Sequence, residues 1–286
     1  VLSMVAVSAI GMILFTSRPV GDAMATTIWG TSSSWTLTAL PLFVWMGEIL
    51  FRTKLSENLF KGLSPWMQKL PGGLIHVNIV GCALFAAISG SSAATVATVG
   101  KMSIPELRKR NYPEKILLGS LAGSGTLGLL IPPSIILIIY GVTVQESIAK
   151  LFIAGIIPGI MIALIFMFYV IIWSLMNKKD MPKILEEYSF LEKVKRSKQL
   201  LPVIILILGV IGSIYTGIAT ATEAASLGVV GALILSYFQK SLNLETFKSS
   251  LLGATKTSCM IAFILAGSTF LSLAMGFTGL PRNLAL

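Results

Sequence analysis

Long apolar runs separated by short polar segments fill the chain. They cover about residues 1–15, 35–51, 74–88, 116–144, 151–176, 200–218, 222–238 and 251–277. Most approach the roughly 20 apolar residues that a helix needs to cross a bilayer. The pattern predicts an all-α integral membrane protein, a multi-span helical bundle without a separate soluble domain.

Composition supports the same class. Hydrophobic residues make up 55% of the 286 residues, charged residues only 12%, and the mean hydropathy is +0.85. Such values lie outside the range of water-soluble domains. Cys82 and Cys259 both lie within apolar runs, so they are expected to pack as small hydrophobic groups and not to form a disulfide or a metal site.

Basic residues gather in the polar segments and set the expected orientation. Residues 105–115 and 177–199 are rich in Lys and Arg, and residues 52–73 read as an amphipathic helix at the membrane surface. The positive-inside rule places all three on the cytoplasmic side. The net charge of +10 is thereby explained without nucleic acid, because no basic patch is interleaved with aromatic residues. The basic residues of these three segments are, in chain order, Arg52, Lys54, Lys61 and Lys69; Arg108, Lys109, Arg110 and Lys115; and Lys178, Lys179, Lys183, Lys193, Lys195, Arg196 and Lys198.

This orientation makes the segment 74–104 begin and end on one side of the membrane. It is too apolar for a surface loop, and its centre is the small, hydroxyl-rich sequence SGSSAAT at 89–95. Irregular backbone at membrane depth is tolerated only where protein buries it or where it lines a wet cavity. The segment is therefore predicted to be a re-entrant helical hairpin.

The next apolar run, 116–144, contains the interruption GSGTLGLLIPPS at 123–134. Pro132 and Pro133 each lack an amide donor and clash with the preceding turn, so this helix should break near its middle. Paired discontinuous helices are how secondary transporters build ion and substrate sites.

Hydroxyl and carbonyl oxygens at the hairpin tip suit a hard cation such as sodium, and the first ligands to consider are Ser89, Ser91 and Ser92. Helix N-termini at the same point favour an anionic substrate. The alternative is that small residues here only permit close helix packing. The full candidate site consists of Ser89, Gly90, Ser91, Ser92, Thr95, Gly125, Thr126, Gly128, Pro132, Pro133 and Ser134.

Two acidic residues within apolar runs have a structural or a coupling role. Glu48 lies four residues before Arg52, so an ion pair on one helix face is the simpler interpretation. Glu223 begins a run directly after Thr222, and a Thr cap with a first-turn carboxylate stabilises a helix start. Both are expected to be mainly structural.

Nothing in the sequence indicates an enzyme. It contains no HExxH, GxSxG or Walker A motif, and its single histidine, His76, is insufficient for most catalytic or metal clusters. We expect no catalysis and no cofactor beyond a coupling ion.

Several stretches together resemble the DctM-type large membrane subunit of tripartite ATP-independent periplasmic (TRAP) transporters. Each stretch alone is weak, but the ordered set is specific and spans nearly the whole chain. They are LPLFVWMGE at 40–48, SGSSAAT at 89–95, IPE at 104–106 with Tyr112, GLLIPPS at 128–134, LFIAGIIPG at 151–159 and TEAA at 222–225.

The resemblance implies an elevator-type secondary carrier built from inverted repeats. Residues 1–199 would form the first repeat and residues 200–286 the start of a second, incomplete one. The carrier would sit in a bacterial or archaeal cytoplasmic membrane and import organic anions, such as C4-dicarboxylates or sialic acid, with a sodium gradient. Its partners would be a small DctQ-type membrane subunit and a DctP-type periplasmic binding protein. The hairpin tip and broken helix would supply a sodium site and part of the substrate site.

Two other interpretations remain open from the sequence. The chain could belong to a stand-alone sodium- or proton-coupled dicarboxylate or citrate symporter, which needs no binding protein. It could also be a non-transporting membrane scaffold, although polar hairpin tips at membrane depth argue against that.

Overall fold

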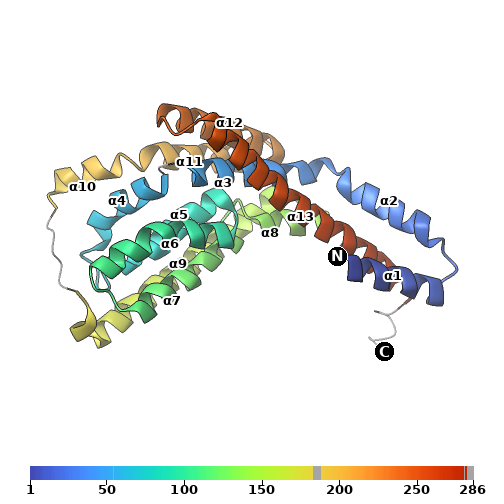
Figure 1. Cartoon of the computed structure of the whole chain (residues 1–286), viewed down its shortest axis with the longest axis horizontal. Coiled ribbons are helices and arrows are strands. Elements are labelled where there is room, and N and C mark those ends of the chain that lie inside the picture. The colour runs from blue at the N-terminus through green and yellow to red at the C-terminus, as the bar shows by residue number, and fades with distance from the viewer. Residues whose placement is uncertain (54, 183–187, 280, 282–286) are drawn as a thin grey trace.

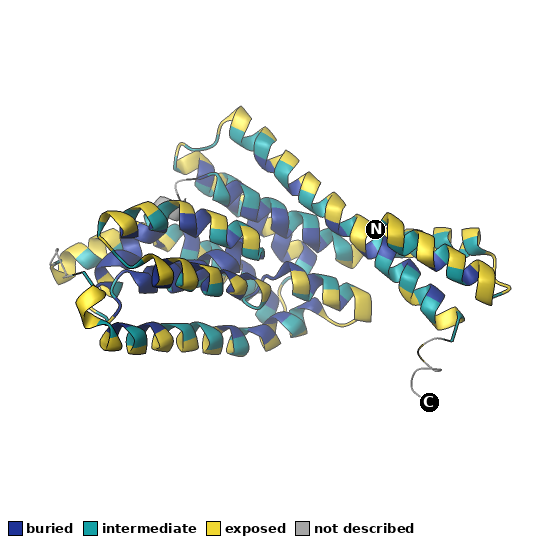
Figure 2. Ribbon diagram, turned by 60° about the horizontal axis from the view of Figure 1, so that its bottom comes forward, coloured by how far each residue is buried: buried dark blue, intermediate teal, exposed yellow. Residues whose placement is uncertain are grey.

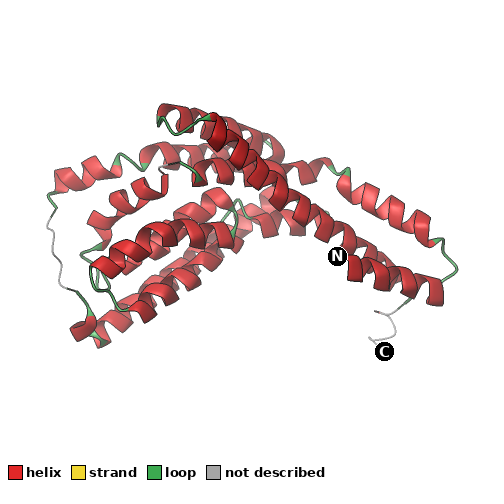
Figure 3. Ribbon diagram, in the orientation of Figure 1, coloured by secondary structure: helices red, strands yellow, loops and turns green. Residues whose placement is uncertain are grey.

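The computed structural model consists of helices and short connections throughout its described residues, which are 1–53, 55–182, 188–279 and 281 (Figure 3). This confirms the all-α prediction. Lys54 of the expected surface helix, Lys183 with the rest of 183–187 in the expected linker, and residues 280 and 282–286 of the expected second repeat lie outside the described residues. The elements are α1 (Leu2–Phe15), α2 (Val20–Ser32), η1 (Trp35–Thr38), α3 (Ala39–Phe51), α4 (Leu55–Met67), α5 (Ile75–Ser89), α6 (Ser92–Lys109), α7 (Glu114–Gly125), η2 (Thr126–Leu129), α8 (Ile135–Val144), α9 (Ile148–Met176), η3 (Lys178–Asp180), α10 (Phe190–Ser197), α11 (Leu201–Tyr215), α12 (Ala221–Phe238) and α13 (Leu244–Phe277).

Three of the described helices, α9, α12 and α13, are each long and apolar enough to cross a membrane. Two bent pairs, α2 with η1 and α3 at 53° and α10 with α11 at 54°, bring the number of possible spans to five. The apolar runs at 1–15 and 74–88 form shorter helices. The sequence separated eight apolar runs, so fewer helices are full-length spans than the runs suggested.

One helix was not expected from the sequence, and another begins earlier than expected. Helix α2 was not predicted, because its Asp and Thr residues lower the local hydropathy. Helix α13 begins at Leu244 and not near 251, because the side chain of Asn243 accepts a hydrogen bond from the amide of Thr246 at 2.6 Å. That cap starts the helix within a polar stretch that a hydropathy pattern passes over.

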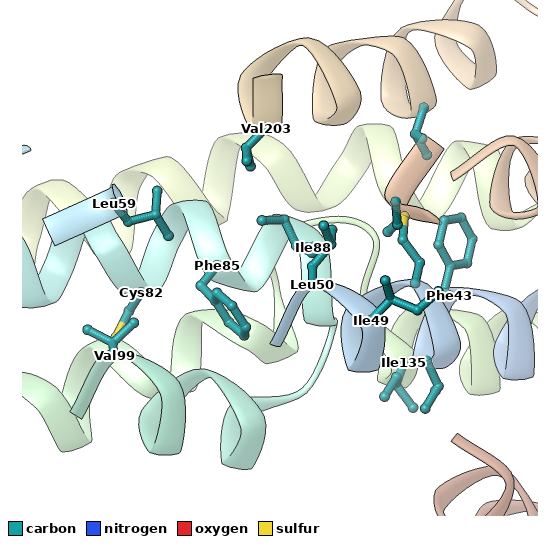
Figure 4. Packing of buried hydrophobic residues seen from close by; sticks show 14 of the residues in the cluster. Phe43, Ile49, Leu50, Leu59, Cys82, Phe85, Ile88, Val99, Ile135 and Val203 are labelled. Carbon is teal, nitrogen blue, oxygen red and sulfur yellow. The ribbon is translucent and has the colours of Figure 1, made fainter. Parts of the chain in front are cut away.

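The molecule is elongated (Figure 1). Helices α4, α5, α6, α7 and α9 gather at one end, whereas α1, α2 and the C-terminal half of α13 extend towards the other. Helix α3 lies between the two groups and packs on α5, α8, α12 and α13. Its Phe43, Ile49 and Leu50 are buried in the main hydrophobic cluster (Figure 4). Helix α3 therefore connects the two ends of the molecule.

Large apolar side chains also cover the outside. On α9, Ile157, Leu164 and Phe168 are all more than half exposed, and the outer face of this helix is largely unburied (Figure 2). A contiguous apolar surface of this kind is unfavourable in water and favourable against lipid tails. The exposure pattern agrees with a helical membrane protein.

Polar contacts fasten α3 to α13. Arg52 forms an ion pair with Glu48, and its Nε donates to Ser249 Oγ at 3.0 Å. The carboxylate of Glu48 lies against Gly253, where a Cβ would be 2.5 Å from Oε2. The expected pairing of Glu48 with Arg52 is confirmed, and the pair is seated on a second helix that the sequence did not identify.

The start of the hairpin is tied to its end by Tyr112. The amide of Leu74 donates to the Tyr112 hydroxyl at 3.0 Å, and the same hydroxyl lies against Gly73. Burial raises the pKa of the Tyr112 phenol, so the group stays neutral at ordinary pH. His76 Nε2 lies 2.7 Å from the carbonyl of Pro71, a local contact at the start of the hairpin. The bond between Leu74 and Tyr112 holds the two ends of the hairpin together.

Replacing Tyr112 by Phe should lower the stability of the protein, because the Leu74 amide loses its partner in partly buried surroundings. The cost expected for one such hydrogen bond is about 1 kcal/mol, which corresponds to a fall in Tm of roughly 2–4 °C in a chain of this size. Thermal unfolding of the detergent-purified protein measures it. Tyr237→Phe is the matched control, since Tyr237 is 69% exposed; equal Tm values for the two variants would contradict the account.

Candidate functional site

The tip of the hairpin is a tight turn between two helices. Helix α5 ends at Ser89, and Gly90 follows in the left-handed conformation with φ of +58°. Ser91 then has extended backbone, and its hydroxyl accepts from the amide of Ala94 at 3.4 Å, which caps α6. The predicted helical hairpin is thus formed, and its turn consists of a glycine C-cap followed directly by a serine N-cap.

Oxygen atoms cluster inside this turn. The hydroxyls of Ser89 and Thr95 lie 3.0 Å apart, and Ser89 Oγ donates to the carbonyl of Ser91 at 3.3 Å. Ser89 is 5% exposed and Thr95 is fully buried. The buried hydroxyl of Ser92 has no hydrogen-bond partner within the described part of the chain. A buried polar atom of this kind normally has a partner, so the turn is suited to receive a ligand.

The broken helix is formed as expected. Helix α7 ends at Gly125, the 3₁₀ turn η2 follows, and α8 begins at Ile135 after a cis peptide bond between Pro132 and Pro133. The hydroxyl of Ser134 donates to the carbonyl of Leu129 at 2.7 Å across the break. This bond satisfies a carbonyl near the end of η2 and fixes the start of α8.

The tip and the break are joined through their backbones. The amide of Ile135, the first residue of α8, donates to the carbonyl of Gly90 at 3.2 Å. A Cβ at Gly90 would lie 2.5 Å from the carbonyl oxygen of Pro133, and one at Gly128 would lie 2.9 Å from the amide nitrogen of Ser92. Only glycine permits this approach, so the two discontinuities form one unit.

Two further helices enclose this unit. A Cβ at Gly47 of α3 would lie 2.8 Å from the Cα of Ser89. On the opposite side of the break, a Cβ at Gly155 of α9 would lie 2.7 Å from the carbonyl oxygen of Leu130. The tip is therefore packed against α3, and the break is packed against α9.

The structure brings most of the candidate residues together, with two exceptions. Thr126 is exposed, and its hydroxyl donates back to the carbonyl of Gly123 at 2.6 Å. The ring of Pro132 lies near Gly155 of α9, on the side of the break that packs against that helix. The residues grouped around the tip are Ser89, Gly90, Ser91, Ser92, Thr95, Gly125, Gly128, Pro133 and Ser134, with Gly125 packed on Val96.

Glu223 lies at the start of α12, where it forms a capping box. Its carboxylate accepts from the amide and the hydroxyl of Thr220, both at 2.8 Å, and its own amide donates to the Thr220 hydroxyl at 3.3 Å. The capping residue is thus Thr220 and not Thr222, which lies buried one residue inside the helix. The mainly structural interpretation of Glu223 agrees with this geometry.

Sequence reasoning missed several residues that support the site. Gly47 and Gly155 carry no signal of their own, although both lie in stretches that carried the resemblance. Asn78 is a polar residue inside an apolar run and could have been noticed. It is fully buried, and its side-chain nitrogen donates to Ser120 Oγ at 3.1 Å and to the carbonyl of Leu117 at 3.3 Å. These bonds join α5 to α7, so the hairpin and the broken helix share a second polar contact.

A large open cavity lies elsewhere in the described part of the chain. It has a volume of about 890 Å³ and opens between α2, the α8–α9 connection, the start of α12 and α13. Its wall is rich in hydroxyls, including those of Thr27, Thr31, Thr143 and Thr220, and Glu146 is the only charged residue among the described residues that line it. It contains none of the residues at the hairpin tip.

Comparisons with known proteins agree with this arrangement. A family model described as the DctM component of tripartite ATP-independent periplasmic transporters matches residues 1–286. The C4-dicarboxylate TRAP large permease DctM of Pseudomonas aeruginosa is 32% identical over 97% of this chain and 64% of its own length. The sialic acid TRAP large permease SiaM of Vibrio cholerae is also 32% identical with the same coverage, and the ectoine/5-hydroxyectoine permease UehC of Ruegeria pomeroyi is 35% identical over 87% of the chain and 58% of its own length.

The chain thus spans somewhat less than two thirds of the length of these relatives. The match to the family covers all 286 residues, including both the hairpin and the broken helix. The chain belongs to the DctM family, the large permease subunits of TRAP transporters.

Proposed function

We propose that this chain works in a sodium-coupled TRAP secondary transporter that imports an organic anion, and that the hairpin tip and the broken helix form its first ion- and substrate-binding region. The observation that carries the proposal is the oxygen cluster of the buried Ser89 and Thr95 with the half-buried Ser91, next to the Ser92 hydroxyl, which has no partner among the described residues. It lies where two broken helices meet, as in other secondary transporters.

Sodium suits this cluster for chemical reasons. All its donors are neutral oxygens, hydroxyl or carbonyl, which hard cations prefer. A hydroxyl that donates to another oxygen within the turn can rotate and present a lone pair to a cation instead. The Ser89 and Thr95 hydroxyls, 3.0 Å apart, can make this change without moving their helices.

An anionic substrate is supported by the helix ends at the same point. Helix α6 begins at the tip and α8 begins at the break, and neither has an acidic residue in its first turn. Their N-termini therefore carry a partial positive charge that no acidic side chain of the first turn offsets, which favours a carboxylate nearby. The 890 Å³ cavity is less suitable, because its single charged side chain, Glu146, would repel an anion.

The family assignment supports the remaining parts of the proposal. The relatives' names refer to C4-dicarboxylate, sialic acid and ectoine transport, and we infer a carboxylate-bearing substrate for this chain as well. A small DctQ-type membrane subunit and a DctP-type periplasmic binding protein are the proposed partners, in a cytoplasmic membrane. The proposed mechanism is an elevator movement of the hairpin and the broken helix as one body, with residues 1–199 and 200–286 belonging to two inverted repeats.

The direct test is solute uptake by proteoliposomes that contain the complete permease and its small subunit. Uptake of the solute bound by the cognate binding protein should require both that protein and an inward sodium gradient, and a potassium gradient of equal size should not replace it. The sodium gradient supplies the driving force, and the binding protein supplies the substrate. Uptake that does not depend on the binding protein would favour a stand-alone symporter. Uptake that does not depend on the sodium gradient would contradict the proposal that sodium is the coupling ion.

Substitutions at the cluster test the ion site itself. Ser89→Ala and Thr95→Val each remove one oxygen ligand and should weaken sodium binding by at least about fivefold, the effect of one lost polar contact of roughly 1–3 kcal/mol. Sodium binding is measured as the rise in Tm with sodium concentration, because a ligand that binds only the folded state stabilises it.

Thr98→Val is the matched control for this experiment. Thr98 lies one turn further along α6, and its hydroxyl donates to the carbonyl of Ala94 at 2.7 Å within the same helix. This variant should keep the sodium response of the unmodified protein. A sodium response that is unchanged in all three variants would place the ion elsewhere.

A further inference from the structure

A second cavity lies between the flank of the hairpin and the two helices beside it, apart from the candidate site. Its volume is about 600 Å³, and it is bounded by Ile79 of α5, by one face of α7 and by one face of α9. None of the residues at the hairpin tip lines it. A cavity of this size falls within the roughly 300–1,000 Å³ typical of small-molecule sites.

The cavity is an open groove, and small residues form much of its α7 side. A Cβ at Gly119 would meet no atom within 4 Å, and one at Gly123 would meet only the ring of Phe166, at 3.6 Å. Gly119 is exposed, so the two glycines leave this side of the groove open at the surface without side chains that fill it.

The groove has an ionic end. Lys115 lies in the first turn of α7, is exposed, and forms no ion pair with any residue in the described ranges. The neighbouring Glu114 is engaged by Arg108 at 2.8 Å. Trp173 and Tyr169 of α9 line the groove as well. A cation beside Trp and Tyr is the arrangement found where proteins meet lipid headgroups.

The length of the groove favours a lipid acyl chain over a transmembrane helix as its occupant. The groove runs along α7 from Lys115 to Gly123, which is eight residues or about 12 Å along the helix axis. The hydrocarbon core of a bilayer is about 30 Å thick, so each leaflet contributes about half of that. A transmembrane helix from another subunit would need a contact surface about twice as long, whereas the acyl chain of one leaflet fits.

We propose that this groove binds one anionic phospholipid, with its phosphate on Lys115 and an acyl chain lying over Gly119 and Gly123. The ammonium group supplies the charge that attracts an anionic headgroup, and the glycines and Phe166 supply an apolar channel. The lipid would fill the space between α5, α7 and α9 and so support the helices that carry the hairpin and the break.

Filling the groove tests its acyl part. Native mass spectrometry of the complete permease, purified in detergent and titrated with phosphatidylglycerol, counts the bound lipids. Gly119→Leu should remove one bound phosphatidylglycerol, because its side chain enters the groove without displacing protein atoms. The matched control is Gly209→Leu on α11, where a Cβ also meets nothing within 4 Å and the surface is exposed; it should retain the full number.

Removing the charge tests the headgroup part. Lys115→Gln should weaken phosphatidylglycerol binding roughly fivefold, the contribution expected of one basic residue at an anionic surface, and should leave phosphatidylethanolamine binding nearly unchanged. Lys178→Gln, the same change at an exposed position beyond α9, should have no effect on the binding of either lipid.

Lipid counts that are equal in the unmodified protein and in Gly119→Leu would overturn the proposal. So would a Gly119→Leu variant that loses the small membrane subunit but no lipid, since a protein helix would then occupy the groove.

Discussion

The structure depends on the contact between the hairpin tip and the broken helix, in which each supplies what the other lacks. A chain that turns or unwinds among apolar helices leaves amides and carbonyls without partners, and in lipid each such group costs several kcal/mol. The Gly90 carbonyl and the Ile135 amide satisfy one another at 3.2 Å, and Ser134 and Ser91 satisfy groups on either side. The approach is possible because Gly128 and Gly90 have no side chains to separate the two backbones.

Helix α3 joins this unit to the rest of the molecule through two consecutive residues. Gly47 lies against Ser89 at the tip, whereas Glu48 pairs with Arg52 and rests on Gly253 of α13. A displacement of the tip must therefore either carry α3 with it or break the contact at Gly47. The close backbone contact on one side and the polar contacts on the other make α3 the helix through which movement of the tip would reach α13.

Much of the site could be read from the sequence, because its signals are local. The serine-rich centre of an apolar segment predicted the hairpin, and Pro132 with Pro133 predicted the break. The spacing of Glu48 and Arg52 predicted their pairing. Contacts between distant segments could not be predicted, since nothing in the sequence around Gly47 or Gly155 identifies the backbone that each will meet. Helix α2 and the first turns of α13 were missed because their polar residues conceal them in a hydropathy pattern.

The central proposal is that the tip and the break together bind sodium, and the most direct measurement that tests it is the accessibility of the tip. Ala93, exposed in the first turn of α6, is replaced by Cys in a background in which the exposed Cys259 is Ser, and its reaction rate with a maleimide is followed. Sodium, but not potassium, should slow the labelling of this cysteine severalfold, while a cysteine at the exposed Glu146 reacts at an unchanged rate. Labelling at position 93 that is the same in both salts would contradict the account.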